Sequence, residues 1–574
     1  MSHYVARAQP HDADPRHTFQ RIQRVTQARP HARRQIRLRQ VASDDHPRPL
    51  AHPRQPHLHL HGGGILCLVQ DGNLVTARQQ PRDGQVFLVK ECPDCGVTET
   101  LISADADRYL TKRHLDGQHA EPAGCGLNCL ECRRKRQPSF IFLDITNRCN
   151  SNCPICINNT PSMGFLFEPP LEYFEKIFDY FARLEPRPAV QLFGGEPTVR
   201  EDLFDIIAMA RSRGLRVRVV TNGLRLANEE YCRKLVGSRA TILIAYDGAN
   251  AETYRVLRGN EKYLQAKQKA LDNISRLHGA KVALMTCVAK GFNDAELPEL
   301  LEFCHERRDF IRGVYFLPLA QTWKADEFSL EPPKVTTEDL EIMLSACFPE
   351  DRIDFVPAGV LGELKGILDG LEATPPPFAG AHPNCESMYI LVSDGQQYVP
   401  LARYLKGSLP QFIDALFAAD ARARRLAERM QTGPWGRLLG AVGLRKRYLK
   451  LRTLLTVART VRRNLKVGKL LKGRGVGKAW HLLAGAAGML FRVKSRRILE
   501  RHTTWQGTLQ VIVLPFEDDS NLETERLERC PNSFAFYDPE RQEVNYVPTC
   551  AWSQHKRPVM RRIADYYAKA PASF

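Results

Sequence analysis

Short apolar runs alternate with amphipathic stretches through the middle of the chain, between residues 138 and 325. The apolar runs have the length of β-strands and predict them at residues 140–145, 189–193, 216–220, 241–246, 282–288 and 314–319. Apolar residues at helical spacing predict helices between the strands, for example at 171–184 and 203–213. This alternation indicates βαβ units, and therefore an α/β fold with a parallel sheet. In such sheets the functional residues lie on the loops at the carboxyl ends of the strands.

The segments before this core have other textures. Residues 1–63 are rich in Arg, His, Pro and Gln, and their apolar residues do not recur with a regular period. We therefore expect a disordered tail, or a start codon assigned too far upstream. His57, His59 and His61 in that tail alternate and could bind a metal. Residues 64–137 predict a small cysteine-rich metal-binding region. Its strand at 85–90 is expected to pair with a strand at 65–69 across residues 70–84.

The segments after the core divide at a turn-rich stretch, residues 372–377. Residues 326–420 form a C-terminal extension that is β-rich from 383 onward. Residues 421–503 are expected to be a basic helical insertion. Residues 504–574 form a cysteine-bearing end with strands at 509–514 and 543–547 and a closing helix from about residue 557.

Positive charge is concentrated in one part of the chain. The 574 residues carry a net charge of +18, and residues 421–501 alone hold 23 lysines and arginines against two acidic residues. Leucines recur there near helical spacing, which is typical of a basic amphipathic helix on an anionic membrane surface. An ordinary helical subdomain with a solvated basic face is the alternative. Nucleic acid is disfavoured because aromatic residues are sparse in this segment.

Neither a transmembrane run nor the apolar core of a signal peptide is evident. We therefore expect a cytoplasmic protein, with the basic insertion as its only candidate for peripheral contact at the inner membrane face.

Nine of the 16 cysteines fall between Cys67 and Cys156, many at metal-ligand spacing. In a reducing compartment such clusters bind metal more often than they form disulfides. Cys149, Cys153 and Cys156 follow the first core strand with the spacing C-x₃-C-x₂-C. Three thiolates on one short loop can bind three irons of a cubane cluster and leave the fourth iron open. A zinc loop is the alternative.

This spacing and its context resemble the radical S-adenosylmethionine (SAM) superfamily. The sequence Gly194-Gly195-Glu196-Pro197 after the second strand resembles the family's GGEP motif, and Asn222 ends the next strand. The resemblance implies a partial (β/α)6 barrel, a [4Fe-4S] cluster on Cys149, Cys153 and Cys156 as the catalytic centre, and SAM as cosubstrate. It also implies a reducing partner such as a flavodoxin or ferredoxin. The residues that it assigns to SAM binding are Gly194, Gly195, Glu196, Pro197, Asn222 and Asn293.

Further metal sites are expected upstream of this loop. Cys125, Cys129 and Cys132 repeat the C-x₃-C-x₂-C spacing and favour a second [4Fe-4S] cluster, with a zinc loop as the alternative. Its fourth ligand would come from elsewhere, and the candidates are Cys385, Cys530 and Cys550. Cys92 and Cys95 form a C-x₂-C knuckle that suits a rubredoxin-like iron or zinc, unless the knuckle is degenerate and held by packing.

The doubled triplet, the knuckle and a late Pro-x-Cys together resemble one subgroup, the tetraether lipid synthases and class D radical SAM methylases. This resemblance implies hydrogen abstraction from an unactivated C–H, for C–C bond formation or methylation on a lipid. A methylase of a pterin-like small molecule is the first alternative. An RNA-modifying radical enzyme and a non-enzymatic electron carrier are the others.

Overall fold

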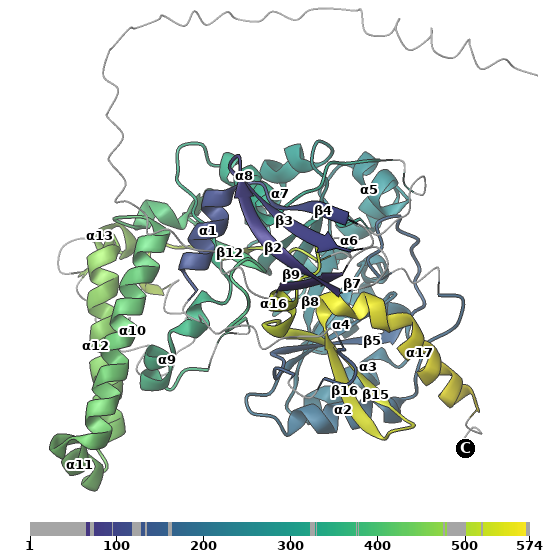
Figure 1. Ribbon diagram of the computed structural model, residues 1–574. Helices are drawn as coiled ribbons and strands as arrows, with labels where there is room; N and C mark the ends of the chain where they lie inside the picture. The colour runs from purple at the N-terminus through teal and green to yellow at the C-terminus, as the bar shows by residue number, and fades with distance from the viewer. Residues whose placement is uncertain are drawn as a thin grey trace, which may run out of the picture. The chain divides into compact units, whose positions relative to one another are not determined.

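The core strands form a continuous parallel run in the computed structural model (Figure 1). Strand order follows chain order, and each strand pairs in parallel with the next. The strands are β5 (Phe140–Thr146), β6 (Ala189–Gly194), β7 (Arg216–Thr221), β8 (Thr241–Ala245), β9 (Val282–Val288) and β10 (Ile311–Pro318). The predicted α/β fold with strands at these positions is confirmed.

The structure describes residues 65–68, 74–93, 96–116, 128–132, 135–158, 163–321, 328, 330–374, 376, 378–473, 477–478, 481, 501–517 and 521–569. The expected tail and its three histidines lie outside this range.

Helices return the chain between the parallel strands. They are α2 (Leu171–Ala182), α3 (Leu203–Ser212), α4 (Glu229–Gly237), α5 (Ala251–Arg258), α6 (Tyr263–Ser275) and α7 (Leu297–Glu306). Their apolar stripes face the sheet, as on α2, where Phe174, Ile177, Phe178 and Phe181 are completely buried. This packing leaves the strand ends as the place where polar side chains gather.

Strands from the C-terminal third extend the same sheet at both edges. β14 (Thr508–Val513) pairs in parallel with β10, and β15 (Asn532–Asp538) pairs in parallel with β5. The remaining strands are β11 (Val356–Pro357), β12 (Ser387–Ser393), β13 (Tyr398–Pro400) and β16 (Glu543–Pro548). The short helix α16 (Thr524–Glu528) lies between β14 and β15, and α17 (Trp552–Lys569) closes the chain. α17 therefore begins at Trp552, before the expected position of about 557.

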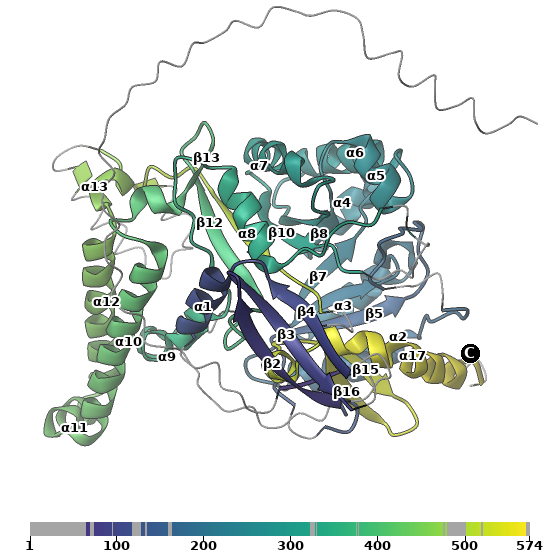
Figure 2. The same cartoon turned by 45° about the horizontal axis from the view of Figure 1, so that its top comes forward.

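A separate four-stranded sheet precedes the core (Figure 2). It contains β1 (Ile65–Leu68), β2 (Leu74–Arg82), β3 (Gln85–Cys92) and β4 (Gly96–Ser103), followed by α1 (Ala106–His114). The predicted pairing of the first and third strands is wrong. Residues 74–82 form β2, which pairs with β1 on one side and β3 on the other.

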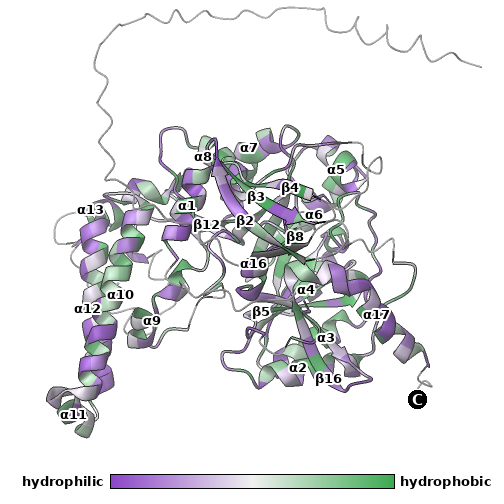
Figure 3. Ribbon diagram, in the orientation of Figure 1, coloured by the Kyte–Doolittle hydropathy of each residue, from purple (hydrophilic) through white to green (hydrophobic). Residues whose placement is uncertain are grey.

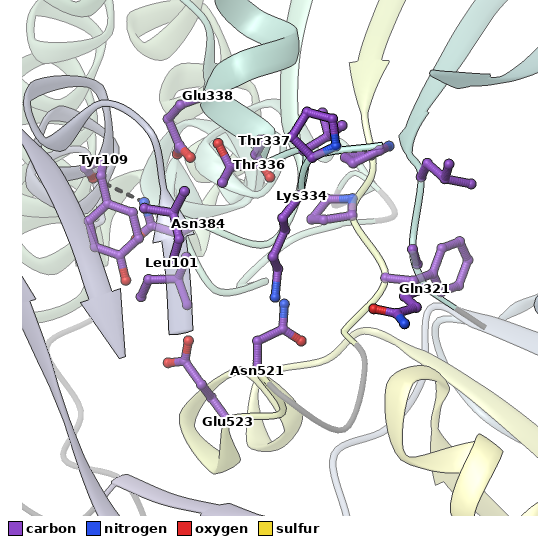
Figure 4. A pocket seen from close by; sticks show the side chains of 18 of the residues that line it. Leu101, Tyr109, Gln321, Lys334, Thr336, Thr337, Glu338, Asn384, Asn521 and Glu523 are labelled. Atoms are coloured by element: carbon purple, nitrogen blue, oxygen red, sulfur yellow. Dashed lines mark hydrogen bonds between the residues drawn. The ribbon is translucent and has the colours of Figure 1, made fainter. Parts of the chain in front are cut away.

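A buried ion cluster fixes this small region to the core. Lys112 on α1 donates to Glu338 at 2.6 Å and to Glu341 at 2.7 Å, both on α8 (Thr337–Ala346). All three side chains are almost inaccessible to solvent. A cavity of 150 Å³ lies beside this contact, and there Asn384 donates to the carbonyl of Tyr109 at 3.0 Å (Figure 4).

The basic segment is helical in its described part, as predicted. It contains α11 (Pro434–Ala441), α12 (Arg445–Asn464) and α13 (Val467–Leu470). The helix before them, α10 (Leu409–Thr432), begins before residue 421, in the extension that is expected to be β-rich, and packs against α9 (Lys365–Leu371). α10 and α12 lie side by side with α11 at their shared end, and polar residues dominate α12 (Figures 1 and 3). Among the described helices, none combines the length and hydropathy needed to cross a membrane.

Candidate functional site

The cysteine loop leaves the carboxyl end of β5 and is closed at its base by Asn147. The Asn147 amide accepts from the backbone N–H of Phe167 at 2.9 Å and donates to the carbonyl of Phe165 at 2.5 Å. Within the loop, the N–H of Cys156 donates to the carbonyl of Cys153 at 3.2 Å, so these two residues share one turn. Cys149 is exposed, and Cys153 and Cys156 are half-buried.

The backbone of the second loop lies directly against the first. The N–H of Gly195 donates to the carbonyl of Thr146 at 2.7 Å, and that of Glu196 to the carbonyl of Arg148 at 2.8 Å. A Cβ on Gly194 or on Gly195 would lie 2.2 Å from one of those two carbonyl oxygens. The glycines are therefore required for this close approach, which brings the expected SAM motif beside the cysteine loop.

Glu196 is buried and joins the second and third loops. Its Oε1 accepts from the N–H and hydroxyl of Thr198 at 3.0 and 2.6 Å and from the Thr221 hydroxyl at 2.7 Å. Its Oε2 accepts from the N–H of Asn222 at 2.6 Å. The Asn222 side chain in turn donates to Asn150 in the cysteine loop at 2.7 Å. Glu196 thus organises the loops through its own hydrogen bonds, and Asn222 lies next to the cysteines.

Asp247, at the end of β8, forms a two-pronged ion pair with Arg258. The two contacts measure 2.7 and 2.8 Å, and Asp247 also accepts from the N–H of Cys287 at 2.9 Å. Burial opposes ionisation of Asp247, but the charge and hydrogen bonds of Arg258 outweigh it and hold the pKa of the carboxyl below its ordinary value. A Cβ on the next residue, Gly259, would lie 3.0 Å from the carbonyl oxygen of Asn152, so the backbone after this ion pair lies close to the cysteine loop.

Lys267 is a buried cation that sequence reasoning missed. It donates to the carbonyl of Ala245. Burial, reinforced by the charge of Arg258, lowers the pKa of Lys267 to about 8. The signal was available, because Lys267 interrupts the apolar stripe of α6 between Leu264 and Leu271.

Asn293 is buried in the loop after β9, where it holds its own turn. Its side chain accepts from the N–H of Ala289 at 2.8 Å and donates to the carbonyl of Cys287 at 2.9 Å. Both polar atoms of the amide are therefore used within the loop.

The last helix joins the site from the far end of the chain. Lys556 on α17 donates to Asn158 at 2.7 Å and contacts Asp144 on β5 at 3.3 Å. Asn158 also donates to the carbonyl of Gly194. The Trp552 indole completes the group by donating to Asp144 at 2.8 Å. One buried network thus connects the cysteine loop, the second loop and α17.

A cavity of 570 Å³ occupies the inside of the barrel below the cysteine loop. Ile157, Asn158 and Met163 border it on the loop side, and side chains of the strands line the rest. Aromatic rings make much of the wall, namely Phe140, Phe142, Phe193, Tyr315, Phe378, Phe516, Phe534 and Trp552. Polar side chains are interspersed, including Gln191, Arg218, Glu386 and Asn532. The cavity suits a ligand that is flat and partly polar.

The other expected metal ligands fall into separate places. Cys92 is buried at the end of β3, and Cys95 lies outside the described residues. Cys125 also lies outside them. Cys129 is buried, and Cys132 is exposed and close to Lys135. Lys135 donates to Asn545 on β16, and Asn545 in turn donates to the carbonyl of Leu130 at 2.8 Å.

Cys385, Cys530 and Cys550 lie near one another. Cys530 and Cys550 flank the open end of the β15–β16 hairpin, whose strands pair at Ser533 and Pro548. Burial raises the pKa of each of the three thiols; Cys530 also contributes to the shift of Cys385, and Cys530 and Cys385 both contribute to that of Cys550. The three candidates for a fourth ligand therefore form a group of their own at the cavity wall, to which Cys550 belongs.

The donor chemistry of the Cys149 loop fits an iron–sulfur cluster, since three thiols lie on one loop at the carboxyl end of a parallel strand. Within the described ranges, no three or more His, Cys, Asp or Glu side chains converge closely enough to hold a single metal ion.

Comparison with known proteins agrees with this interpretation. Residues 143–304 match the family model described as the radical SAM superfamily. The chain is 30% identical over 339 residues to 7,8-dihydro-6-hydroxymethylpterin dimethyltransferase of Methanocaldococcus jannaschii, covering 56% of this chain and 66% of that protein. It is 32% identical over 189 residues to GTP 3′,8-cyclase of Nautilia profundicola, covering 32% of this chain and 58% of the cyclase. The chain thus spans less than two thirds of each relative.

Two solved structures resemble the chain at low similarity. SuiB of Streptococcus suis bound to S-adenosylmethionine gives a TM-score of 0.30 at 15% identity, over 37% of this chain and 47% of SuiB. Native anSMEcpe with bound AdoMet and a peptide gives 0.32 at 14% identity, over 42% of this chain and 69% of that chain.

The parallel barrel, the cysteine loop and the family match together define the class. Residues 143–304 match the radical SAM superfamily, and they include the cysteine loop and the strands β6 to β9. The family implies a [4Fe-4S] cluster and SAM.

Proposed function

We propose that this radical SAM enzyme abstracts hydrogen from a small, partly polar heterocycle of the pterin class, for methylation or C–C bond formation. Cys149, Cys153 and Cys156 would hold the [4Fe-4S] cluster, and the loops at 194–197 and Asn222 would bind SAM. When bound, the cluster supplies the electron that splits SAM and so generates the 5′-deoxyadenosyl radical that removes the hydrogen atom. A flavodoxin or ferredoxin would deliver that electron.

The residues of the chain contribute positioning and exclusion of water. The contact between Gly195 and Thr146 holds the two loops together, and Glu196 fixes the third loop against them. Trp552 and Lys556 line the cavity beside the cysteine loop. A reactive radical would therefore form next to a cavity whose wall combines aromatic and polar side chains.

The composition of the cavity wall is the main observation in favour of a heterocyclic substrate. A lipid chain inside it would leave Arg218, Glu386 and Asn532 facing hydrocarbon. Each buried polar group left without a partner costs roughly 1–3 kcal/mol. A heterocycle with its own donors and acceptors avoids this cost, which favours the pterin-like substrate over the lipid that the subgroup resemblance first suggests.

The names of the relatives support the same choice. One is described as acting on a hydroxymethylpterin and the other on GTP, and both molecules contain a fused 2-amino-4-oxopyrimidine ring.

The test compares two substrate classes on the reconstituted enzyme under anaerobic conditions with SAM and dithionite. We expect 6-hydroxymethyl-7,8-dihydropterin to raise 5′-deoxyadenosine formation above the substrate-free level, and an archaeal or bacterial lipid extract to leave it unchanged. The reverse result would refute the pterin proposal and restore the lipid one.

Auxiliary metal sites are a further part of the proposal. Cys125, Cys129 and Cys132 would hold a second [4Fe-4S] cluster, and Cys92 with Cys95 a rubredoxin-like iron or a zinc ion. Thiolate ligands at these spacings suit iron and zinc.

We also propose peripheral contact with an anionic membrane through the basic segment. Large apolar side chains are exposed around α11, with Trp435 at 68%, Leu438 at 55% and Val442 at 58% exposure. Exposed cations lie next to them, at Arg437, Arg445, Lys446 and Arg447. Apolar anchors beside basic side chains are typical of interfacial helices.

Vesicle flotation tests this contact. We expect the protein to float with phosphatidylglycerol-rich vesicles and a Trp435→Ser/Leu438→Ser variant to float less. A Val97→Ser variant is the matched control, because Val97 is 66% exposed on β4, in the separate N-terminal sheet. A protein that ignores the vesicles yet shifts tRNA would contradict the membrane proposal.

A further inference from the structure

Polar side chains on the wall of the 570 Å³ cavity carry atoms without partners among the described residues, namely Arg218, Glu386, Asn532 and Thr549. The first three are used here, because the protein fixes the orientation of their polar atoms. Asn532 Oδ1 is an acceptor and Arg218 Nε is a donor. Glu386 Oε2 is an acceptor in the ionised carboxylate, the form that a bound ring N–H and the nearby Arg218 charge would favour over the protonated form of the empty cavity. None of these three atoms has a hydrogen-bond partner among the described residues. Glu386 and Asn532 are more than nine-tenths buried. Groups in such surroundings are normally paired, so the atoms point to a missing ligand.

The orientation of the two acceptors is fixed by the protein. Asn532 donates through its Nδ2 to Glu386 Oε1 at 3.0 Å, so its Oδ1 cannot exchange places with the nitrogen without losing that bond. Asn532 also lies in β15, where it pairs in register with Phe140 of β5. The two unpartnered oxygens therefore belong to one linked pair of side chains.

The donor is held just as firmly. The Arg218 guanidinium lies 4.8 Å from the ring centre of Phe140 and 5.6 Å from that of Tyr315. It also donates to the Tyr315 hydroxyl at 3.1 Å. Its charge acts on the Glu386 carboxyl, which places both side chains in the same part of the wall.

We propose that Arg218, Glu386 and Asn532 bind the 2-amino-4-oxopyrimidine edge of the substrate. Along that edge the ring presents a carbonyl oxygen, a ring N–H and an exocyclic amino group. An acceptor followed by two donors complements one protein donor and two acceptors. The ring oxygen is assigned to Arg218, the ring N–H to Glu386 and the amino group to Asn532.

Other heterocycles fit this set less well. A 2,4-dioxo ring such as lumazine places a carbonyl oxygen where the amino group would be, against the fixed oxygen of Asn532. An adenine-type edge lacks the two adjacent donors. The aromatic side chains Phe140 and Tyr315, which hold Arg218, provide flat surfaces against which a fused ring can stack.

This inference rests on the proposed function, because it assigns residues to the substrate of the same cavity. The test therefore measures binding separately from SAM cleavage. The reconstituted enzyme with SAM is titrated anaerobically with 6-hydroxymethylpterin and with 6-hydroxymethyllumazine, using the fluorescence of each compound. We expect the pterin to bind at least about tenfold more tightly, since loss of one buried hydrogen-bond match costs roughly 1–3 kcal/mol.

Variants separate the roles of the three residues. Glu386→Gln and Asn532→Leu should bring the affinities of the two compounds to within about threefold of each other. Arg218→Met should weaken both compounds by a similar factor, because both carry the 4-oxo group. Glu523→Gln is the matched control, since Glu523 is another buried carboxyl but belongs to the 150 Å³ cavity.

Each outcome decides a different claim. Equal binding of the two compounds by the unmodified enzyme would overturn the inference even if no variant folds, and pterin-stimulated 5′-deoxyadenosine formation would then keep the proposed function. Absence of pterin binding together with absence of stimulated SAM cleavage would overturn both.

Discussion

The ammonium group of Lys556 lies 2.7 Å from the side-chain oxygen of Asn158. Nearly four hundred residues separate them in the chain. The contact nevertheless joins the final helix to Asn158, which follows Cys156 by two residues. The side chain of Asn158 also donates a hydrogen bond to the carbonyl of Gly194. The C-terminal helix is therefore joined by hydrogen bonds to the loops that carry the cysteine and glycine motifs.

Replacing Lys556 tests this connection. We expect Lys556→Met to lower SAM cleavage at least about tenfold, because Asn158 loses the partner that orients it. The variant should also lose about 3–5 kcal/mol of stability, since it leaves Asp144 buried without its cation. The measurements are 5′-deoxyadenosine formation and thermal unfolding.

A double variant, Asp144→Asn/Lys556→Met, removes the buried charge together with its partner. It should recover much of the stability without recovering SAM cleavage. Recovery of both properties would mean that Lys556 acts on stability alone.

The close approach of the two loops predicts strong intolerance at Gly195. Gly195→Ala places a Cβ 2.2 Å from the carbonyl oxygen of Arg148, so the loops must separate. We expect weaker SAM binding, measured by equilibrium dialysis, and reduced activity. Gly237→Ala serves as the control, because nothing lies within 4 Å of the Cβ that alanine would add there, at the end of α4. Equal behaviour of the two variants would contradict the proposed role of the glycine.

The Glu386 carboxyl predicts a pH dependence of stability. Burial raises the pKa of Glu386 from 4.5 to about 8, against the opposing effects of Asn532 and Arg218. Between these values the folded protein holds a proton that the unfolded chain has released, so this contribution to stability falls as the pH rises. The slope reaches at most about 1.4 kcal/mol per pH unit.

Glu386→Gln cannot titrate and should lack this component. The free energy of unfolding, measured by denaturant titration from about pH 5 to about pH 8, should therefore fall less steeply for the variant than for the unmodified protein. Parallel curves would show that Glu386 is ionised throughout.

Iron content tests the auxiliary cluster. We expect about eight irons per chain after anaerobic reconstitution if two [4Fe-4S] clusters form, with any knuckle-bound iron in addition. Cys149→Ala and Cys129→Ala/Cys132→Ala should each lose about four. A double-cysteine variant with unchanged iron content would dismiss the second cluster.

Much of the fold could be predicted because its signals are local. Apolar runs such as 140–145 and 282–288 mark buried parallel strands, and the loops after them carry the cysteine and glycine motifs. β15 was missed, because Asn532–Asp538 becomes a strand only by pairing with β5, almost four hundred residues earlier. Such non-local pairing leaves little trace in a window of sequence.

The same limit applies to the site. Cys149 and Gly195 belong to motifs with recognisable spacing, whereas Glu386, Asn532 and Lys556 come from scattered segments that only the fold brings together. Lys267 and Asp144 are intermediate cases. Asp144 is a charged residue in an apolar strand, and Lys267 is a charged residue on the apolar face of α6. Such a local irregularity indicates burial with a partner but does not identify the partner.

The most direct test of the central claim is the formation of 5′-deoxyadenosine from SAM by the reconstituted enzyme supplied with 6-hydroxymethyl-7,8-dihydropterin deuterated at its C–H positions. We predict deuterium in the 5′-deoxyadenosine formed by the unmodified enzyme, and no 5′-deoxyadenosine from Cys149→Ala. Cleavage of SAM by Cys149→Ala at the unmodified rate, or product without deuterium, would contradict the account.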